Sequence, residues 1–139
     1  MCGIAGWLGE KINSDTCAEI LTRLTHRGPD GSGHWSADGV WLGHRRLAVL
    51  DLSSQGHQPM VSSSKQLILT YNGEIYNYLE LRAELKRNGV YFHGESDTEV
   101  VLAACEFWGI EKAVSRFEGM FSFALYNVNE RILWLVRDP

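Results

Sequence analysis

The order of the predicted strands along the sequence constrains the fold more than any other feature. Six apolar stretches have the length and the residue types of strands: 2–8, 40–43, 46–50, 67–71, 121–127 and 132–137. The last two flank a turn at 127–130 and are predicted to form a hairpin. Because the strands occur in runs that only two or three helices interrupt, we expect an α+β fold in which antiparallel sheets predominate.

Residues that can cap a helix mark where the helices are predicted to begin. Three helices are expected: one over roughly 16–25 after Ser14 or Asp15, one after Asn77, and one over about 97–108 after Ser96. In the last two, a glutamate three residues after the cap, Glu80 or Glu99, has the spacing of a capping box. The turn-rich segments 26–33 and 51–66 are predicted to be loops.

Composition restricts the class of protein and its compartment. The 139 residues, 45% hydrophobic and 22% charged, have the make-up of one soluble globular domain. A net charge of −4 gives no electrostatic reason to expect nucleic acid, and no apolar run approaches the ~20 residues that a membrane span needs. The three cysteines, Cys2, Cys17 and Cys105, are widely spaced and form no CxxC motif. We therefore expect a cytoplasmic protein with no disulfide framework and no metal site, and with neither nucleic acid nor a membrane as a partner.

The second residue of the chain is a cysteine, and nothing that looks like a signal peptide precedes it. Removal of Met1 would leave a thiol and a free α-amino group on the same residue. An unperturbed α-amino group has a pKa of about 7.7–8 and an unperturbed thiol one of about 8.5, so such an amine can accept a thiol proton near neutral pH. Cys2 is therefore a candidate nucleophile that carries its own base. On this observation alone, a small buried residue at the start of a strand remains the alternative.

Five segments, taken in order, carry a resemblance to a known family. They are CGIAG at 2–6, HRGPDGSG at 26–33, GHRRLAVLDLS at 43–53 with GHQPM at 56–60, YNGEIYN at 71–77, and SDTEV at 96–100. Together they resemble the glutaminase domain of class II (N-terminal-nucleophile) glutamine amidotransferases, and more narrowly the N-terminal domain of glutamine-hydrolysing asparagine synthetases. The resemblance covers essentially all 139 residues. It implies the four-layer αββα sandwich of the N-terminal-nucleophile hydrolases.

The resemblance also implies roles for the reacting residues. Cys2 would be the nucleophile, and the side-chain amide of Asn72 together with the backbone N–H of Gly73 would form the oxyanion hole. A plain hairpin turn is the alternative for Asn72-Gly73, because this residue pair favours tight turns. The histidines of these motifs, among them His44 and His57, are interpreted as structural, since the α-amino group already provides a base.

Four further residues have roles that the resemblance implies. Arg46 would bind the α-carboxylate of glutamine, because a planar guanidinium suits a carboxylate. Asp97 would pair with the α-ammonium, and helix capping beside Ser96 is its alternative. Glu74 would be a further substrate contact. Arg27 would order the site around Cys2, with a loop-bracing arginine as the alternative.

The activity that the resemblance implies is hydrolysis of L-glutamine to glutamate and ammonia through a Cys2 glutamyl thioester. The ammonia would pass to a covalently linked, ATP-dependent asparagine synthetase domain outside residues 1–139. We expect the glutaminase domain at 1–139 to be incomplete at its C-terminus and to need no cofactor, with ATP and Mg²⁺ only in the synthetase domain; a homodimer is a further expected partner. Two alternatives stay open: a glutaminase that serves another acceptor, such as a cell-surface polysaccharide precursor, and an inactive structural or interaction fragment of the same fold.

Overall fold

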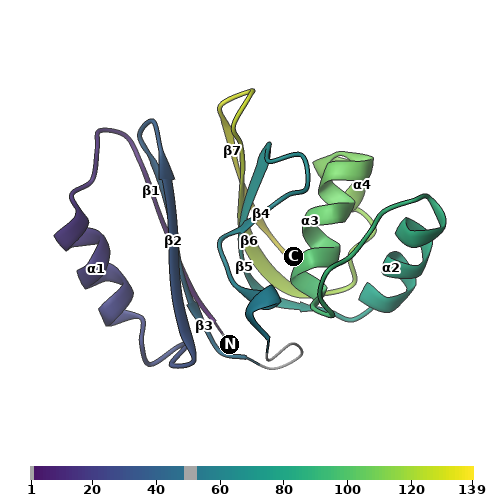
Figure 1. Ribbon diagram of the computed structural model, residues 1–139, viewed down its shortest axis with the longest axis horizontal. Coiled ribbons are helices and arrows are strands. Elements are labelled where there is room, and N and C mark those ends of the chain that lie inside the picture. The colour runs from purple at the N-terminus through teal and green to yellow at the C-terminus, as the bar shows by residue number, and fades with distance from the viewer. Residues whose placement is uncertain (1, 49–52) are drawn as a thin grey trace.

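The computed structural model describes residues 2–48 and 53–139, and its strands form two sheets (Figure 1). The first sheet contains β1 (Gly3–Leu8), β2 (Gly31–Ala37) and β3 (Val40–Arg46), in the order β1-β3-β2. The second contains β4 (Met60–Val61), β5 (Leu67–Ile75), β6 (Gly119–Asn127) and β7 (Ile132–Arg137), in the order β4-β5-β6-β7. Neighbouring strands in both sheets are antiparallel, as the runs of strands predicted.

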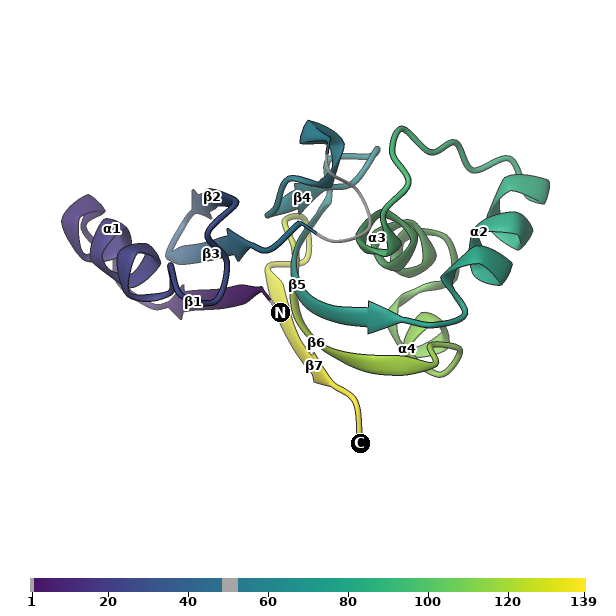
Figure 2. The ribbon, with the colours of Figure 1, turned by 90° about the horizontal axis from the view of Figure 1, so that it is seen from below.

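Helices cover the two outer faces of the paired sheets. α1 (Ser14–Arg23) lies on the outer face of the first sheet (Figures 1 and 2). The other three helices, α2 (Tyr78–Arg87), α3 (Asp97–Trp108) and α4 (Ile110–Val114), lie on the far side of the second sheet. The layers therefore run helix, sheet, sheet, helix, which confirms the predicted αββα sandwich. Across the described part of the chain, each helix is too short or too polar to cross a membrane.

Alternation along β5 divides its side chains between two cores. Successive residues of a strand point to opposite faces of the sheet. Ile68 accordingly packs between the sheets with Leu42 of β3, whereas Leu69 and Tyr71 pack against the helices. Burial on both faces explains why 67–71 forms an unbroken apolar stretch in the sequence.

The first helix begins two residues earlier than predicted and has a different cap. The Asn13 side chain accepts a hydrogen bond from the backbone N–H of Thr16 at 2.7 Å, and the helix starts at Ser14. The assignment of Ser14 or Asp15 as the cap was therefore wrong. All three residue types are good N-caps, so local preference alone does not choose among neighbours.

Of the two predicted capping boxes, one is wrong. The Asn77 amide makes no capping hydrogen bond; it donates to the Arg116 carbonyl at 2.9 Å and accepts from the Glu118 N–H at 3.2 Å. In the other, the Ser96 hydroxyl oxygen accepts a hydrogen bond from the Glu99 N–H at 3.3 Å, as predicted for the start of α3. The Glu99 carboxylate accepts from the N–H groups of His93 at 2.7 Å and Gly94 at 2.8 Å, so only the serine half of this box is formed.

Several predicted loop boundaries also differ. β2 begins inside the turn-rich segment 26–33, and β3 is a single strand up to Arg46 rather than parts of two. Residues 49–50 of the predicted strand 46–50 lie outside the described residues. The segment 51–66, predicted as loop, contains β4 and a short 3₁₀ turn at Ser54–Gly56. The predicted C-terminal hairpin is confirmed by the pairing of β6 with β7.

Candidate active site

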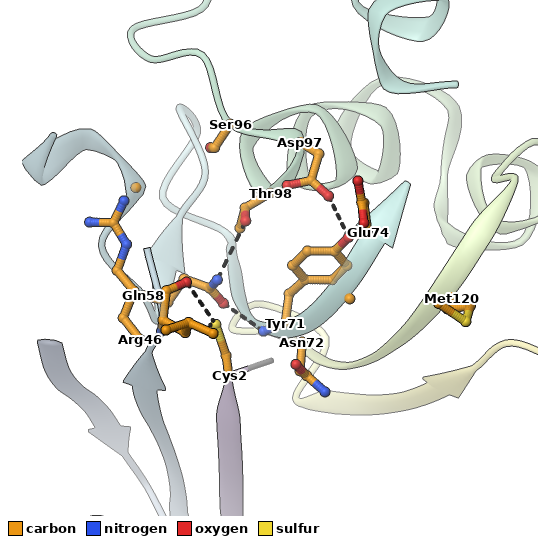
Figure 3. Close-up of a pocket in the computed structure, with 13 residues that line it drawn as sticks. Cys2, Arg46, Gln58, Tyr71, Asn72, Glu74, Ser96, Asp97, Thr98 and Met120 are labelled. Carbon is orange, nitrogen blue, oxygen red and sulfur yellow. Dashed lines mark hydrogen bonds between the residues drawn. The ribbon is translucent and has the colours of Figure 1, made fainter. Parts of the chain in front are cut away.

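A cavity of about 290 Å³ opens where β1 begins, β3 ends and α3 begins (Figure 3). Six of the seven predicted site residues line it: Cys2, Arg46, Asn72, Gly73, Glu74 and Asp97. These residues come from four elements or their ends, and they are far apart in the sequence. The seventh, Arg27, is not among the lining residues; it packs beside Gly3, the neighbour of Cys2, through its Cβ.

Cys2 reaches the cavity because of the register between β1 and β3. Gly3 pairs with Arg45, so the preceding residue lies beside the end of β3. There the half-buried Cys2 thiol is bound twice by Leu47: it accepts from the Leu47 N–H at 3.4 Å and donates to the Leu47 carbonyl at 3.7 Å. These contacts hold the sulfur just before the start of β1, on the wall of the cavity (Figure 3).

The Arg46 guanidinium lies over the short turn that follows β3. Its Nη1 donates to the Ser53 carbonyl at 2.7 Å. A Cβ added at Gly56 would overlap the Arg46 Nη2 atom. The absence of a side chain at Gly56 therefore leaves room for the guanidinium. Contacts with the backbone of this turn thus hold a positive group at the wall of the cavity.

Asn72 and Gly73 lie inside β5, paired with Ser122 and Phe121 of β6. The hairpin-turn alternative is therefore wrong. A Cβ on Gly73 would overlap the Met120 carbonyl oxygen, so this glycine lets β6 approach closely. Among the described residues, the buried Oδ1 atom of Asn72 has no hydrogen-bond partner. Buried polar atoms are usually paired, so Oδ1 is an acceptor that the protein itself leaves unsatisfied.

Asp97 is the first residue of α3 and is only 5% exposed. Its Oδ2 accepts two hydrogen bonds from β5, one from the Tyr71 hydroxyl at 2.6 Å and one from the Ile75 N–H at 3.1 Å. Since Ser96 provides the helix cap, the capping alternative for Asp97 is not needed. Burial, and then the negative charge of Asp97, raise the pKa of Tyr71 well above its ordinary value, so its hydroxyl keeps its proton and remains a donor.

Two side chains that were not among the predicted site residues hold the backbone of Tyr71. The buried amide of Gln58 accepts from the Tyr71 N–H at 2.6 Å and donates to the Thr98 hydroxyl at 3.4 Å (Figure 3). His44 of β3, 1% exposed, contacts the Tyr71 carbonyl through Nε2 at 3.2 Å. Both residues lie within the motifs GHRR and GHQPM, so the motifs contained the signal, but nothing in them showed which backbone group they bind.

The protonation state of His44 follows from its surroundings. Burial, and to a smaller extent the positive charge of Arg46, lower its pKa to about 4 against the opposing effect of the Tyr71 carbonyl. The imidazole is therefore neutral at pH 7, and its proton must be on Nε2 to donate to the carbonyl. This agrees with the interpretation of His44 as structural.

Glu74 is the remaining predicted site residue at the cavity. The Glu74 side chain is exposed at the rim of the cavity, where it adds a negative charge. Over residues 2–48 and 53–139, no three His, Cys, Asp or Glu side chains are grouped closely enough to hold a metal ion. The cavity therefore combines a thiol, a guanidinium, a carboxamide and a buried carboxylate. This set suits a zwitterionic amino acid whose side chain meets a nucleophile.

Comparisons with known proteins identify relatives of this chain. The chain is 38% identical over its full length to "Asparagine synthetase [glutamine-hydrolyzing] 1" of Bacillus subtilis. It is 39% identical over 99% of its length to "Asparagine synthetase [glutamine-hydrolyzing] 1" of Arabidopsis thaliana. It spans only 23% and 24% of these two relatives.

Among solved structures, glutamine phosphoribosylpyrophosphate amidotransferase from B. subtilis matches 92% of the chain with a TM-score of 0.80. The match covers 35% of that enzyme, and the identity is 21%, so this likeness shows the fold alone. The family described as "Glutamine amidotransferase domain" matches residues 1–139. The chain therefore belongs to the family of glutamine amidotransferase domains.

Proposed function

We propose that this chain hydrolyses L-glutamine to L-glutamate and ammonia, with Cys2 as the nucleophile once Met1 has been removed. The observation that carries the proposal is that Cys2, Arg46, Asn72 and Asp97 line one cavity, although they come from different elements. Each has the chemical character that one part of glutamine requires. The family membership supports the same activity.

The two charged residues account for recognition of the amino-acid head group. Arg46 offers a planar guanidinium, which can bind the α-carboxylate through two parallel hydrogen bonds. Asp97 offers a carboxylate for the α-ammonium, and its burial strengthens that interaction, because charges attract more strongly away from water. Glu74 at the rim is a further contact for the ammonium.

The reaction then follows from the groups at the other end of the cavity. The α-amino group of Cys2 takes the thiol proton, and the thiolate forms a C–S bond with the carboxamide carbon. The Asn72 amide and the Gly73 N–H stabilise the oxyanion. Cleavage of the C–N bond releases ammonia, which receives the proton from the amine. Water then cleaves the thioester to give glutamate and free thiol. No cofactor is needed in these steps.

The ammonia is proposed to serve an ATP-dependent asparagine synthetase domain linked to this one. Two observations support this step. The relatives are named asparagine synthetases, and the chain spans only about a quarter or less of their length. ATP and Mg²⁺ would be bound by that domain.

The experiment that tests the proposal is covalent labelling with a chloroketone analogue of glutamine, followed by peptide mass mapping. Cys2 should be labelled stoichiometrically, and the Cys2→Ala variant should neither be labelled nor release ammonia from glutamine. Cys105 serves as the internal control, because burial raises the pKa of its thiol to about 12 and keeps it unreactive. Labelling of Cys17 or Cys105 instead, or hydrolysis by the Cys2→Ala variant, would contradict the mechanism. An unreactive Cys2 in a protein that lacks Met1 would support the inactive-fragment alternative.

A further inference from the structure

We propose that the Tyr71 hydroxyl is a positioning residue for substrate recognition: it fixes the Asp97 carboxylate so that one oxygen faces the α-ammonium of the substrate. The inference rests on the proposed function and deepens it. By orienting Asp97, Tyr71 makes the site select amides that carry an α-ammonium group over amides that lack one.

The two oxygens of Asp97 have different surroundings. Oδ2 accepts both the Tyr71 hydroxyl at 2.6 Å and the Ile75 N–H at 3.1 Å. Within the described residues, no donor reaches Oδ1, and Asp97 lines the cavity. A carboxylate whose one oxygen is held by two donors cannot rotate freely. Oδ1 is therefore the atom left for a charged donor in the cavity.

Tyr71 is itself held at three points, which makes it a rigid support. Its N–H donates to Gln58 and its hydroxyl donates to Asp97 (Figure 3). Its carbonyl accepts from His44. The ring is 2% exposed and packs in the core between β5 and the helices. Burial and the negative charge of Asp97 raise the pKa of Tyr71, so its hydroxyl is a donor at neutral pH.

The position of Asp97 in the helix adds to this arrangement. Asp97 is the first residue of α3, where the helix dipole favours a negative charge. The dipole stabilises the charge but does not choose the orientation of the carboxylate. The directional hydrogen bonds from β5 do so. Loss of the Tyr71 hydroxyl should thus leave a charged carboxylate that is less well oriented.

The test compares two amides in the wild-type protein and in the Tyr71→Phe variant. The first is L-glutamine; the second is 4-carbamoylbutanoate, which is glutamine without the α-amino group. The readout is the ratio of their kcat/KM values, together with KM and kcat for glutamine. Tyr71→Phe should lower the ratio ~10-fold or more, because a hydrogen bond to a charged group is at stake. The glutamine KM should rise while kcat changes little.

Tyr126→Phe is the matched control, because Tyr126 is also buried but lies in the core between the two sheets. It should leave the ratio unchanged. Asp97→Asn should lower the ratio at least as much as Tyr71→Phe. If Tyr71→Phe lowers kcat/KM equally for both amides, the hydroxyl has only a general structural role and the inference is overturned. An unchanged ratio and an unchanged glutamine KM would overturn it too.

Binding to the Cys2→Ala variant separates this inference from the proposed reaction. Calorimetric titration with glutamine needs no chemical step, and adding Tyr71→Phe to Cys2→Ala should weaken glutamine binding ~10-fold or more. If the wild-type protein fails to hydrolyse glutamine but this loss of binding is seen, the proposed hydrolysis fails and the role of Tyr71 stands. If hydrolysis is normal and binding is unaffected by Tyr71→Phe, the role of Tyr71 fails and the hydrolysis stands.

Discussion

Acid should destabilise this protein through one buried histidine. His44 joins the two sheets, because it lies on β3 and its Nε2 donates to the Tyr71 carbonyl on β5 at 3.2 Å. Only the neutral imidazole fits this environment: burial, together with the nearby positive charge of Arg46, lowers the pKa of His44 to about 4. In the unfolded chain, the same imidazole would titrate near 6.5.

The size and direction of the effect follow from these two pKa values. Between pH 6.5 and pH 4, the unfolded state binds more protons at His44 than the folded state, so the free energy of unfolding falls as the pH falls. The contribution is fully present above pH 6.5. At pH 5 about 2 kcal/mol is lost, and the loss approaches about 3 kcal/mol below pH 4. Such losses are large for a small domain, whose total stability is about 5–15 kcal/mol.

Urea unfolding at pH 7 and pH 5 measures the effect, with His44→Gln as the matched variant. A glutamine amide can donate to the Tyr71 carbonyl but does not titrate. The wild-type protein should therefore lose about 2 kcal/mol more than the variant between the two pH values. Carboxylates and the exposed histidines titrate in both proteins and cancel in the difference. Equal losses in the two proteins would refute the reasoning, as would an NMR titration in which the His44 imidazole becomes protonated near pH 6.5.

Three further predictions concern the candidate site. Asn72→Ala should lower kcat for glutamine ~10²–10³-fold, and a change confined to KM in steady-state kinetics would contradict an oxyanion role. Gly56→Ala should raise the glutamine KM with little effect on kcat, because the added Cβ would displace the Arg46 guanidinium; an unchanged KM would contradict this. Gln58→Leu should lower the free energy of unfolding by about 1–3 kcal/mol in urea titrations, because the buried Tyr71 N–H loses its acceptor; a neutral effect would contradict it.

Much of the fold could be predicted because local signals and tertiary structure agree in several elements. The capping residue Ser96 and the helix that follows it are examples, as is the C-terminal hairpin. Near the N-terminus, Asn13, Ser14 and Asp15 are residue types of similar capping preference, and the cap is Asn13. Local preference ranks residue types, but it does not locate the end of an element among equals.

The Asn72-Gly73 pair shows where local preference misleads. This dipeptide favours a tight turn, yet here it continues β5, because β6 pairs with it along its whole length. The glycine serves the close approach of β6 and not a positive φ angle, since Gly73 is not among the residues with positive φ. The long-range partner of a strand is not visible in the local sequence, and so the alternative could not be excluded there.

Some residues of the candidate site could be predicted from the sequence, and others could not. Residues expected to contact a substrate were named from the motifs that carry the family resemblance, and they line one cavity. Gln58, Thr98 and His44 were missed or left as structural, because their polar groups bind other protein groups. Nothing in their residue types shows that all these contacts meet at Tyr71 or at α3.

Tyr71, where these polar contacts meet, links the stability of the fold to the proposed chemistry. Tyr71 is bound by His44 of the first sheet, by Gln58 before β4 and by Asp97 of α3, and the next residue is Asn72. A displacement of about 1 Å in a catalytic group can lower a rate ~10²-fold. A change in the packing of the two sheets therefore acts on the proposed oxyanion donor through one peptide bond. The polar contacts between the layers thus fix the positions of both Asn72 and the Asp97 carboxylate, which is a stricter requirement than holding the sheets together.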